Sequence, residues 1–278
     1  ESLIVYNRSP AKLEPLREVG VAIAPTPEAV IAACGCTILM LTNAQAIREV
    51  VLSDASQAAL PGKTIIQMGT IAPAESIAIA SEIRAAGGDY LEAPVLGSIP
   101  EARAGKLIVM VGGNLGQFAQ WQDVLKCFGP EPVLVGEVGA AAAIKLALNQ
   151  LIASLTTAFA TSLSFVLQQG GDVKEFMDIL RQSALYAPTF DKKLQRMVEH
   201  NYANPNFPTR HLLKDTNLFL SEAGSLSLDT RMVKGVAQIL EQAIALGYAD
   251  ADYSALFSAI NATNTNATDT NATDMPPV

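Results

Sequence analysis

The sequence is poor in cysteine, histidine and positive charge, and each shortage excludes a class of function. Its 278 residues contain three cysteines, and Cys34, Cys36 and Cys127 cannot form a complete set of disulfides, so we expect reduced thiols in a cytoplasmic protein. The two histidines, His200 and His211, do not have the spacing of metal ligands, so we expect no metal site. With 19 Lys and Arg against 27 Asp and Glu, the net charge is −8, which disfavours binding to nucleic acid or to a membrane surface.

The patterns of a secreted or membrane protein are also missing. No charged segment followed by an apolar one opens the sequence, so it does not predict a secretory signal. Residues 151–167 are uncharged, but they contain Ser and Thr throughout, and Lys145 and Asn149 stand just upstream. We expect this stretch to be a helix buried between domains or in an oligomer rather than a membrane span.

Apolar residues, by contrast, are abundant. Half of the residues are hydrophobic and only 17% are charged, so the chain can bury a large core, and its length corresponds to about two domains. From residue 2 to about residue 136, short β-rich runs alternate with amphipathic segments, and the expected strands are 3–6, 21–23, 37–41, 64–67, 90–92, 107–111 and 133–135. Near-continuous apolar strands separated by helices predict a parallel sheet covered on both faces. Residues 1–138 are therefore expected to form a doubly wound α/β domain.

Beyond this domain the strand pattern stops. Residues 140–169 form one helix pattern that ends at Gly170 and Gly171, and further helix patterns continue to about residue 261. We therefore expect an all-helical domain at residues 139–260. Residues 261–278 repeat Asn-Ala-Thr, which predicts a flexible tail. Without a signal peptide we expect no glycosylation at its three sequons, which begin at Asn261, Asn266 and Asn271.

A polar turn, Asn7-Arg8-Ser9, follows the first expected strand. At the end of a strand beside an adenosine ribose, an acidic residue accepts from the 2′-hydroxyl, whereas Arg with a nearby hydroxyl donates to a 2′-phosphate. The turn therefore favours NADP over NAD. The alternative is an ordinary strand-to-helix turn in which Ser9 caps the helix.

Lys145 lies among apolar neighbours, and Asn149 follows one helical turn later on the same face. In the largely buried stretch that this pattern predicts, an unpaired ammonium is costly and its pKa is easily lowered. Such a Lys beside a neutral hydrogen-bond partner fits proton transfer to a carbonyl that is being reduced. The alternative is a Lys whose ammonium extends to solvent.

Taken in order along residues 2–261, the motifs resemble the β-hydroxyacid dehydrogenase family, which includes 3-hydroxyisobutyrate dehydrogenase, and within it the glyoxylate/succinic semialdehyde reductases. The resemblance rests on Asn7-Arg8-Ser9, Gln67-Met68-Gly69-Thr70, the segment 92–98, the segment 136–149 and Phe207-Pro208-x-x-His211-x-x-Lys214-Asp215. It implies a Rossmann-type NADP-binding domain, then a helical substrate and dimerisation domain, in a homodimer or homotetramer. The implied reaction is hydride transfer from NADPH to glyoxylate or succinic semialdehyde.

Site roles are likewise implied by the resemblance. Lys145 would be the catalytic acid and base, and Gly97 and Ser98 would offer backbone and hydroxyl groups to the substrate carboxylate. The other residues implied to hold the substrate are Asn149, Phe207 and Asp215. The residues implied to hold the cofactor are Asn7, Arg8, Ser9, Leu41, Thr70 and Lys214.

Two departures from the family pattern leave other functions open. Leu96 stands where the family usually has Ser, which removes a hydroxyl and leaves room for a 3-hydroxyisobutyrate-type dehydrogenase that oxidises its substrate with NAD(P). No Gly-x-Gly-x-x-Gly occurs in the chain, and we expect that phosphate loop and the family's first strand to precede Glu1. The remaining alternative is a non-catalytic remnant that acts as a dimerising module.

Overall fold

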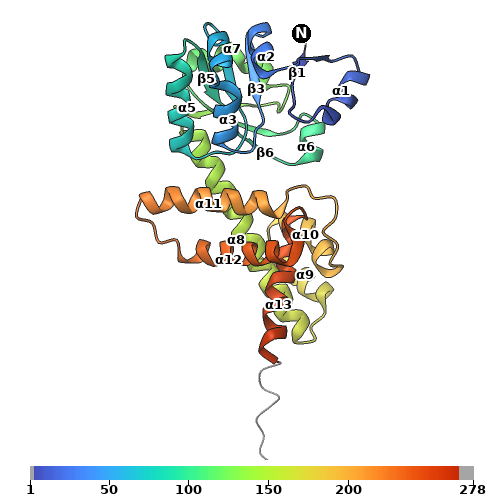
Figure 1. Cartoon of the computed structure of the whole chain (residues 1–278). Coiled ribbons are helices and arrows are strands. Elements are labelled where there is room, and N and C mark those ends of the chain that lie inside the picture. The colour runs from blue at the N-terminus through green and yellow to red at the C-terminus, as the bar shows by residue number, and fades with distance from the viewer. Residues whose placement is uncertain (1–2, 269–278) are drawn as a thin grey trace, which may run out of the picture. The chain divides into compact units, whose positions relative to one another are not determined.

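The computed structural model describes the backbone of residues 3–268, and the chain forms two compact units, Glu1–Lys145 and Leu146–Val278 (Figure 1). Each unit has a hydrophobic core of its own. The expected fold class, a Rossmann-type α/β domain followed by a helical domain, is confirmed.

Unit 1 is built on a six-stranded sheet. Its strands lie in the order β3 (Cys36–Leu39), β4 (Thr64–Gln67), β5 (Asp89–Glu92), β7 (Ile108–Gly112) and β6 (Val95–Leu96), and β8 (Val133–Gly136) also pairs with β7. Strands β3, β4 and β5 are parallel, whereas β7 is antiparallel to β5 and β6. The expected all-parallel sheet is therefore wrong beyond β5. A strand parallel to β5 would need a long crossover connection. The segment between β5 and β7 instead forms the strand β6 and a helix of only five residues, α6 (Ile99–Arg103).

A small parallel sheet precedes this one, with β1 (Ile4–Val5) paired to β2 (Ala22–Ile23). The helices of unit 1 are α1 (Glu14–Glu18), α2 (Pro27–Ala33), α3 (Ala44–Val51), α4 (Asp54–Ala59), α5 (Pro73–Ala85), α6 (Ile99–Arg103) and α7 (Leu115–Leu125).

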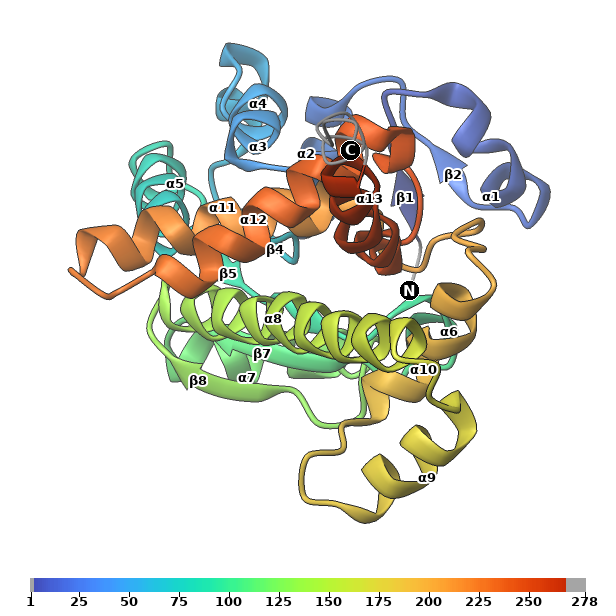
Figure 2. The ribbon, with the colours of Figure 1, turned by 90° about the horizontal axis from the view of Figure 1, so that it is seen from below.

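Alternation along the central strands divides the interior of unit 1 into two cores. Ile65 and Tyr90 pack with α2, α3 and α5 on one face of the sheet, whereas the next residues, Ile66 and Leu91, pack with α7 on the other. All four side chains are fully buried. Successive strand side chains point to opposite faces, so buried neighbours require cover on both sides, and α3 and α5 lie on one side with α7 on the other (Figure 2).

Unit 2 is all-helical, as expected. Its helices are α8 (Ala140–Gln168), which begins in unit 1, α9 (Val173–Gln182), α10 (Pro188–Val198), α11 (Thr209–Ser225), α12 (Arg231–Ala243) and α13 (Leu256–Thr268). The rings of Phe159 in α8 and Phe190 in α10 stack with centroids 4.7 Å apart in the core. The predicted glycine stop of α8 is confirmed, since Gly170 has a φ of +74°.

Helix α13 runs to Thr268, so helical backbone extends into the segment expected from Asn261 onward to be a flexible tail. Asn261 anchors it there: its Nδ2 donates to the carbonyl oxygen of Phe257 at 2.8 Å, and its Oδ1 accepts from Ser164. The rest of the expected tail, with Asn271, lies outside the described residues.

Within the described residues, α8 is the single helix long and apolar enough to cross a membrane, with a mean hydropathy of 1.5. Length and composition alone are weak evidence, because a core helix meets the same criterion. Ala153, Phe159, Ala160 and Leu163 of α8 belong to the core of unit 2, which agrees with the helix being part of a globular fold.

Candidate active site

Two turns that follow neighbouring parallel strands carry the first expected cofactor residues. Leu41 follows β3, Thr70 follows β4, and both side chains are half-buried. The turns approach closely, because a Cβ added to Gly69 would lie 2.5 Å from the carbonyl oxygen of Leu41. Gln67 Nε2 braces the second turn by donating to the Gly69 carbonyl oxygen at 2.9 Å. Ligands of doubly wound sheets bind beyond the carboxyl ends of the strands, which is where Leu41 and Thr70 lie.

The Asn7-Arg8-Ser9 turn follows β1 and is exposed. Asn7 Oδ1 accepts a hydrogen bond from the backbone N–H of Ser9 at 2.8 Å. Ser9 occupies the N-cap position of the short 3₁₀ helix Pro10–Lys12, but its side chain makes no capping hydrogen bond. Ser9 therefore has the N-cap position that the alternative expected, but the Asn7 side chain rather than that of Ser9 supplies the hydrogen bond that shapes the turn.

Gly97 and Ser98 follow β6, which continues the direction of β5 along β7. Gly97 has a φ of +132°, and an added Cβ would lie 2.7 Å from Leu107 Cδ2, so this position requires glycine. The backbone N–H of Ser98 donates to Glu101 Oε2 at 2.8 Å. Since that N–H already has an internal acceptor, the hydroxyl is the group that Ser98 can offer to a ligand, rather than backbone and hydroxyl together.

Lys145 lies near the start of α8, one turn before Asn149. Its side chain is half-buried and Leu146 is buried, but Ile144 and Ala147 are exposed. The expectation of a largely buried stretch is therefore wrong, because one face of the helix is open at this point. Residues four apart share a helix face, so Lys145 and Asn149 lie on the same side of α8.

Asn149, Lys214 and Asp215 form one polar cluster inside unit 2. Asn149 and Asp215 are 2% and 3% exposed, and Asn149 Nδ2 donates to Asp215 Oδ2 at 2.6 Å. Lys214 Nζ lies 2.7 Å from Asp215 Oδ1, so the carboxylate bridges the amide and the ammonium. Asn149 Oδ1 is buried and has no hydrogen-bond partner among the described residues. An unpaired buried acceptor costs about 1–3 kcal/mol, so this oxygen marks a place where a ligand can donate.

Phe207 is not part of that cluster. Its ring stacks on His211 with centroids 6.5 Å apart and meets Tyr253 edge-on at 6.0 Å. Burial lowers the pKa of His211 below its ordinary value, and the positive charges of Arg210 and Lys214 lower it further. His211, to which the sequence assigned no role, therefore presents a neutral ring beside Phe207 near neutral pH.

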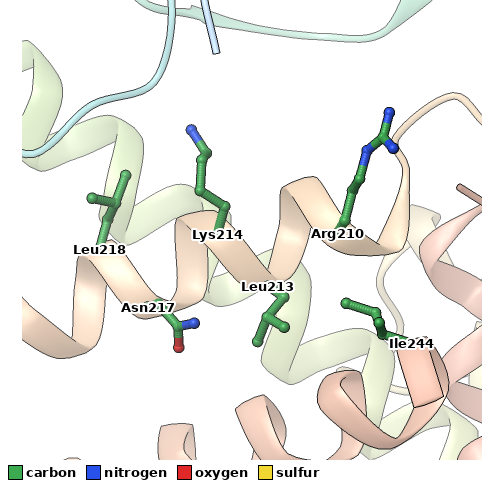
Figure 3. Close-up of a pocket in the computed structure, with 6 residues that line it drawn as sticks. All are labelled: Arg210, Leu213, Lys214, Asn217, Leu218 and Ile244. Carbon is green, nitrogen blue, oxygen red and sulfur yellow. The ribbon is translucent and has the colours of Figure 1, made fainter. Parts of the chain in front are cut away.

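A shallow cavity of about 500 Å³ lies on α11. It is lined by Arg210, Leu213, Lys214, Asn217, Leu218 and Ile244. Arg210 and Lys214 extend from the same side of α11, one turn apart, whereas Leu213 and Asn217 extend from another side (Figure 3). Each of the two cations is paired with a carboxylate, Arg210 with Asp250 and Lys214 with Asp215, so their charges are balanced within unit 2.

Unit 1 thus gathers Leu41, Thr70, Gly97 and Ser98 at the carboxyl end of its sheet, and unit 2 gathers Asn149, Asp215 and Lys214. In the part of the chain that the structure describes, no group of three or more His, Cys, Asp or Glu side chains could hold a metal ion. Sequence reasoning assigned no role to Glu92, a buried carboxylate that binds the start of α8. The sequence feature that could have identified Glu92 is an acidic residue at the end of an apolar strand.

Comparison with known proteins agrees with this arrangement. Residues 1–138 match the NAD-binding domain of 6-phosphogluconate dehydrogenase, and residues 139–260 match the NAD-binding domain of NADP-dependent 3-hydroxyisobutyrate dehydrogenase. Glyoxylate/succinic semialdehyde reductase 2 of Arabidopsis thaliana is 30% identical over 94% of this chain and 73% of its own length. The cytokine-like nuclear factor N-PAC of Xenopus tropicalis is 28% identical over 93% of this chain, which spans about half (48%) of that protein.

Among solved structures, that of Mycobacterium tuberculosis 3-hydroxyisobutyrate dehydrogenase with L-serine has the same fold. The TM-score is 0.83 at 21% identity, over 93% of this chain and 90% of that one. The chain therefore belongs to the NAD(P)-dependent β-hydroxyacid dehydrogenase family, related to 3-hydroxyisobutyrate dehydrogenase, whose enzymes act on CH–OH groups.

Proposed function

We propose that this chain reduces a small aldehyde acid, glyoxylate or succinic semialdehyde, to the hydroxy acid with NADPH. The observation that carries the proposal is the Lys145 and Asn149 pair on α8, with the buried Asn149 Oδ1 lacking a partner among the described residues. The hydroxyl of a hydroxy acid donates one hydrogen bond and would satisfy that oxygen. Similarity to a glyoxylate/succinic semialdehyde reductase supports the substrate class.

Each side chain of the site has a separate role in the proposed reduction. Bound NADPH supplies the hydride. Lys145 stabilises the charge that develops on the carbonyl oxygen and donates the proton, a role that typically contributes about 10²- to 10⁴-fold in rate. Asp215 holds the Asn149 amide through the 2.6 Å hydrogen bond, which orients Oδ1. The Ser98 hydroxyl is assigned to the substrate carboxylate, and Phe207 supplies apolar surface.

The residues present fit a phosphorylated dinucleotide at the turn that carries Arg8 and at the turns that carry Leu41 and Thr70. The exposed Arg8 guanidinium supports binding of a 2′-phosphate and hence NADP, because no acidic side chain stands in the Asn7-Arg8-Ser9 turn to accept from a 2′-hydroxyl. Thr70 is assigned to the nicotinamide end, the turn that carries Leu41 is assigned to the length of the cofactor, and Lys214 is assigned a contact with the cofactor.

The test is NADPH oxidation with glyoxylate and with succinic semialdehyde as substrates. Lys145→Ala is expected to lower kcat by about 10²-fold or more. Lys126→Ala is the matched control, because Lys126 forms only an exposed ion pair with Asp123 and should leave kcat unchanged. Absence of turnover, or turnover that survives Lys145→Ala, contradicts the proposal, and failure to bind NADPH at micromolar concentrations favours a non-catalytic module.

A second candidate is an oxidative 3-hydroxyisobutyrate-type dehydrogenase. Leu96 leaves room for it, since this half-buried residue in β6 contributes no hydroxyl to hold a small aldehyde acid. Comparing kcat/KM for reduction with NADPH and for oxidation with NADP and NAD separates the two. A strong preference for NAD contradicts the role proposed for Arg8.

We also propose self-association through α8. Leu151, Leu155 and Phe165 are 50%, 39% and 66% exposed on this helix, and a second copy would cover them. Cys34, Cys36 and Cys127 form no disulfide in the described part of the chain, and this supports a reducing, cytoplasmic compartment. Sedimentation of the wild type and of Phe165→Glu tests the association, which the charge should weaken.

A further inference from the structure

Glu92 ends β5 and is 1% exposed. Its Oε1 accepts hydrogen bonds from the backbone N–H groups of Gly139, Ala141 and Ala142 at 2.8, 2.9 and 3.3 Å. Its Oε2 accepts from Ser76 Oγ, which in turn lies 2.9 Å from the hydroxyl of Tyr90. A carboxylate from a distant strand therefore binds the first turn of α8.

This contact replaces an ordinary local cap. The first N–H groups of a helix have no partner within the helix and are usually satisfied by a polar side chain at the preceding residue, which here is the glycine Gly139. The negative charge of Glu92 is also favourable at the positive end of the helix dipole, which offsets the cost of burying it.

Neighbouring glycine makes room for the carboxylate. A Cβ added to Gly112 of β7 would lie 2.2 Å from Glu92 Oε1. Glycine at this position therefore leaves the space that the Glu92 side chain occupies beneath the start of α8.

Two segments of unit 1 that carry proposed site residues begin at the contact between Glu92 and α8. The chain leaves Glu92 directly into residues 93–98, which carry Gly97 and Ser98, and α8 leads from Ala141 to Lys145 in one turn. We propose that Glu92 is a positioning residue that sets Lys145 relative to Ser98. This proposal rests on the role proposed for Lys145 and adds a residue that does not itself touch the substrate.

The consequence is an effect on kcat rather than on cofactor binding. Glu92→Ala removes the acceptor for the three N–H groups and is expected to lower kcat about 10²-fold, because a displacement of about 1 Å at the reacting groups has that effect. Glu92→Gln keeps an acceptor oxygen of the same reach and is expected to restore kcat to within about tenfold of the wild type. The Kd for NADPH should change less than about threefold in both variants, because the residues assigned to the cofactor lie elsewhere.

The experiment combines kinetics with amide hydrogen exchange of the full chain, followed by NMR at Gly139, Ala141 and Ala142. Tyr90→Phe is the matched control, since it removes a buried hydroxyl from the same network but leaves the bonds from Glu92 to α8. Exchange at the three amides should accelerate about tenfold or more in Glu92→Ala, which corresponds to the loss of a hydrogen bond worth about 1.4 kcal/mol. In Tyr90→Phe it should remain at the wild-type rate.

Unchanged exchange in Glu92→Ala overturns the contact itself. Faster exchange with unchanged kcat per folded molecule overturns the positioning role. A kcat in Glu92→Gln as low as in Glu92→Ala also overturns it. If the wild type lacks reductase activity, the proposed function fails and the positioning role fails with it, whereas the exchange rates still decide whether Glu92 holds α8.

Discussion

Lys193 and Asp252 form a buried ion pair whose removal provides a quantitative test of the unit 2 structure. Lys193 Nζ lies 2.8 and 2.9 Å from the two carboxylate oxygens, and the side chains are 6% and 0% exposed. Asp252 also accepts from the backbone N–H groups of Ser254 and Asn206. The pair thereby ties α10 to the segment that leads through Phe207 into α11.

The perturbation is Lys193→Met, which keeps the apolar volume and removes the charge. Leaving Asp252 buried without its cation should lower the free energy of unfolding by about 3–5 kcal/mol. Adding Asp252→Asn removes the stranded charge and keeps one acceptor oxygen, which can serve the N–H of Ser254 or of Asn206 but not both, because the two N–H groups bind different carboxylate oxygens. The double variant should therefore recover to within about 2 kcal/mol of the wild type.

The same pair has a defined pH signature. Burial opposes ionisation of Asp252, yet Lys193 and Ser254 hold the pKa of the carboxyl below its ordinary value. This stabilisation is complete above the unfolded pKa of about 3.9 and is lost as the pH falls through the folded value. In Lys193→Met the Ser254 hydrogen bonds remain, but the ammonium no longer opposes the effect of burial, so the pKa of Asp252 should rise. The difference in stability from the wild type should therefore narrow as the pH falls from 7 to 4.

Urea unfolding followed by far-UV circular dichroism measures these differences through the helices of unit 2, while Trp121, the single tryptophan, reports on unit 1. Arg231→Met is the control. The ion pair of Arg231 with Asp229 is exposed, so the free energy of unfolding of this variant should equal that of the wild type. A loss below about 1 kcal/mol in Lys193→Met, or no recovery in the double variant, would refute the reasoning.

Three further predictions concern single residues. Gly112→Ala should destabilise the protein by about 1–3 kcal/mol in urea unfolding, because the new Cβ meets the Glu92 carboxylate, and an unchanged midpoint contradicts that packing. Arg8→Ala should weaken NADPH binding about tenfold in fluorescence titration and leave NADH binding unchanged. An equal loss of affinity for both cofactors would contradict a contact between Arg8 and the 2′-phosphate. His211 should titrate below about 6.5 by NMR, and Lys214→Ala should raise its pKa by removing a nearby positive charge; a value at or above 6.5 contradicts the burial seen here.

Much of the fold follows from local sequence signals. The glycines at 170 and 171 end α8 where predicted. Paired apolar residues such as Ile65 and Ile66 require helices on both faces of the sheet. These signals act over a few residues, so the pattern alone was sufficient to predict them. The candidate roles of Lys145 and Arg8 came from family motifs and remain predictions.

Contacts between residues far apart in the sequence, in the site and in the core, were decided by tertiary structure. Glu92 meets Gly139 across 47 residues, Lys193 meets Asp252 across 59, and Asn149 meets Asp215 across 66. No periodicity encodes such pairs, because each depends on where the packing of whole helices and strands brings two distant side chains. The amino-acid sequence by itself determined the order of elements and which residues could carry the chemistry. Only the folded chain decided which acceptor each polar group meets, since hydrogen bonds form within about 3 Å and distant segments reach that range only through the packed core.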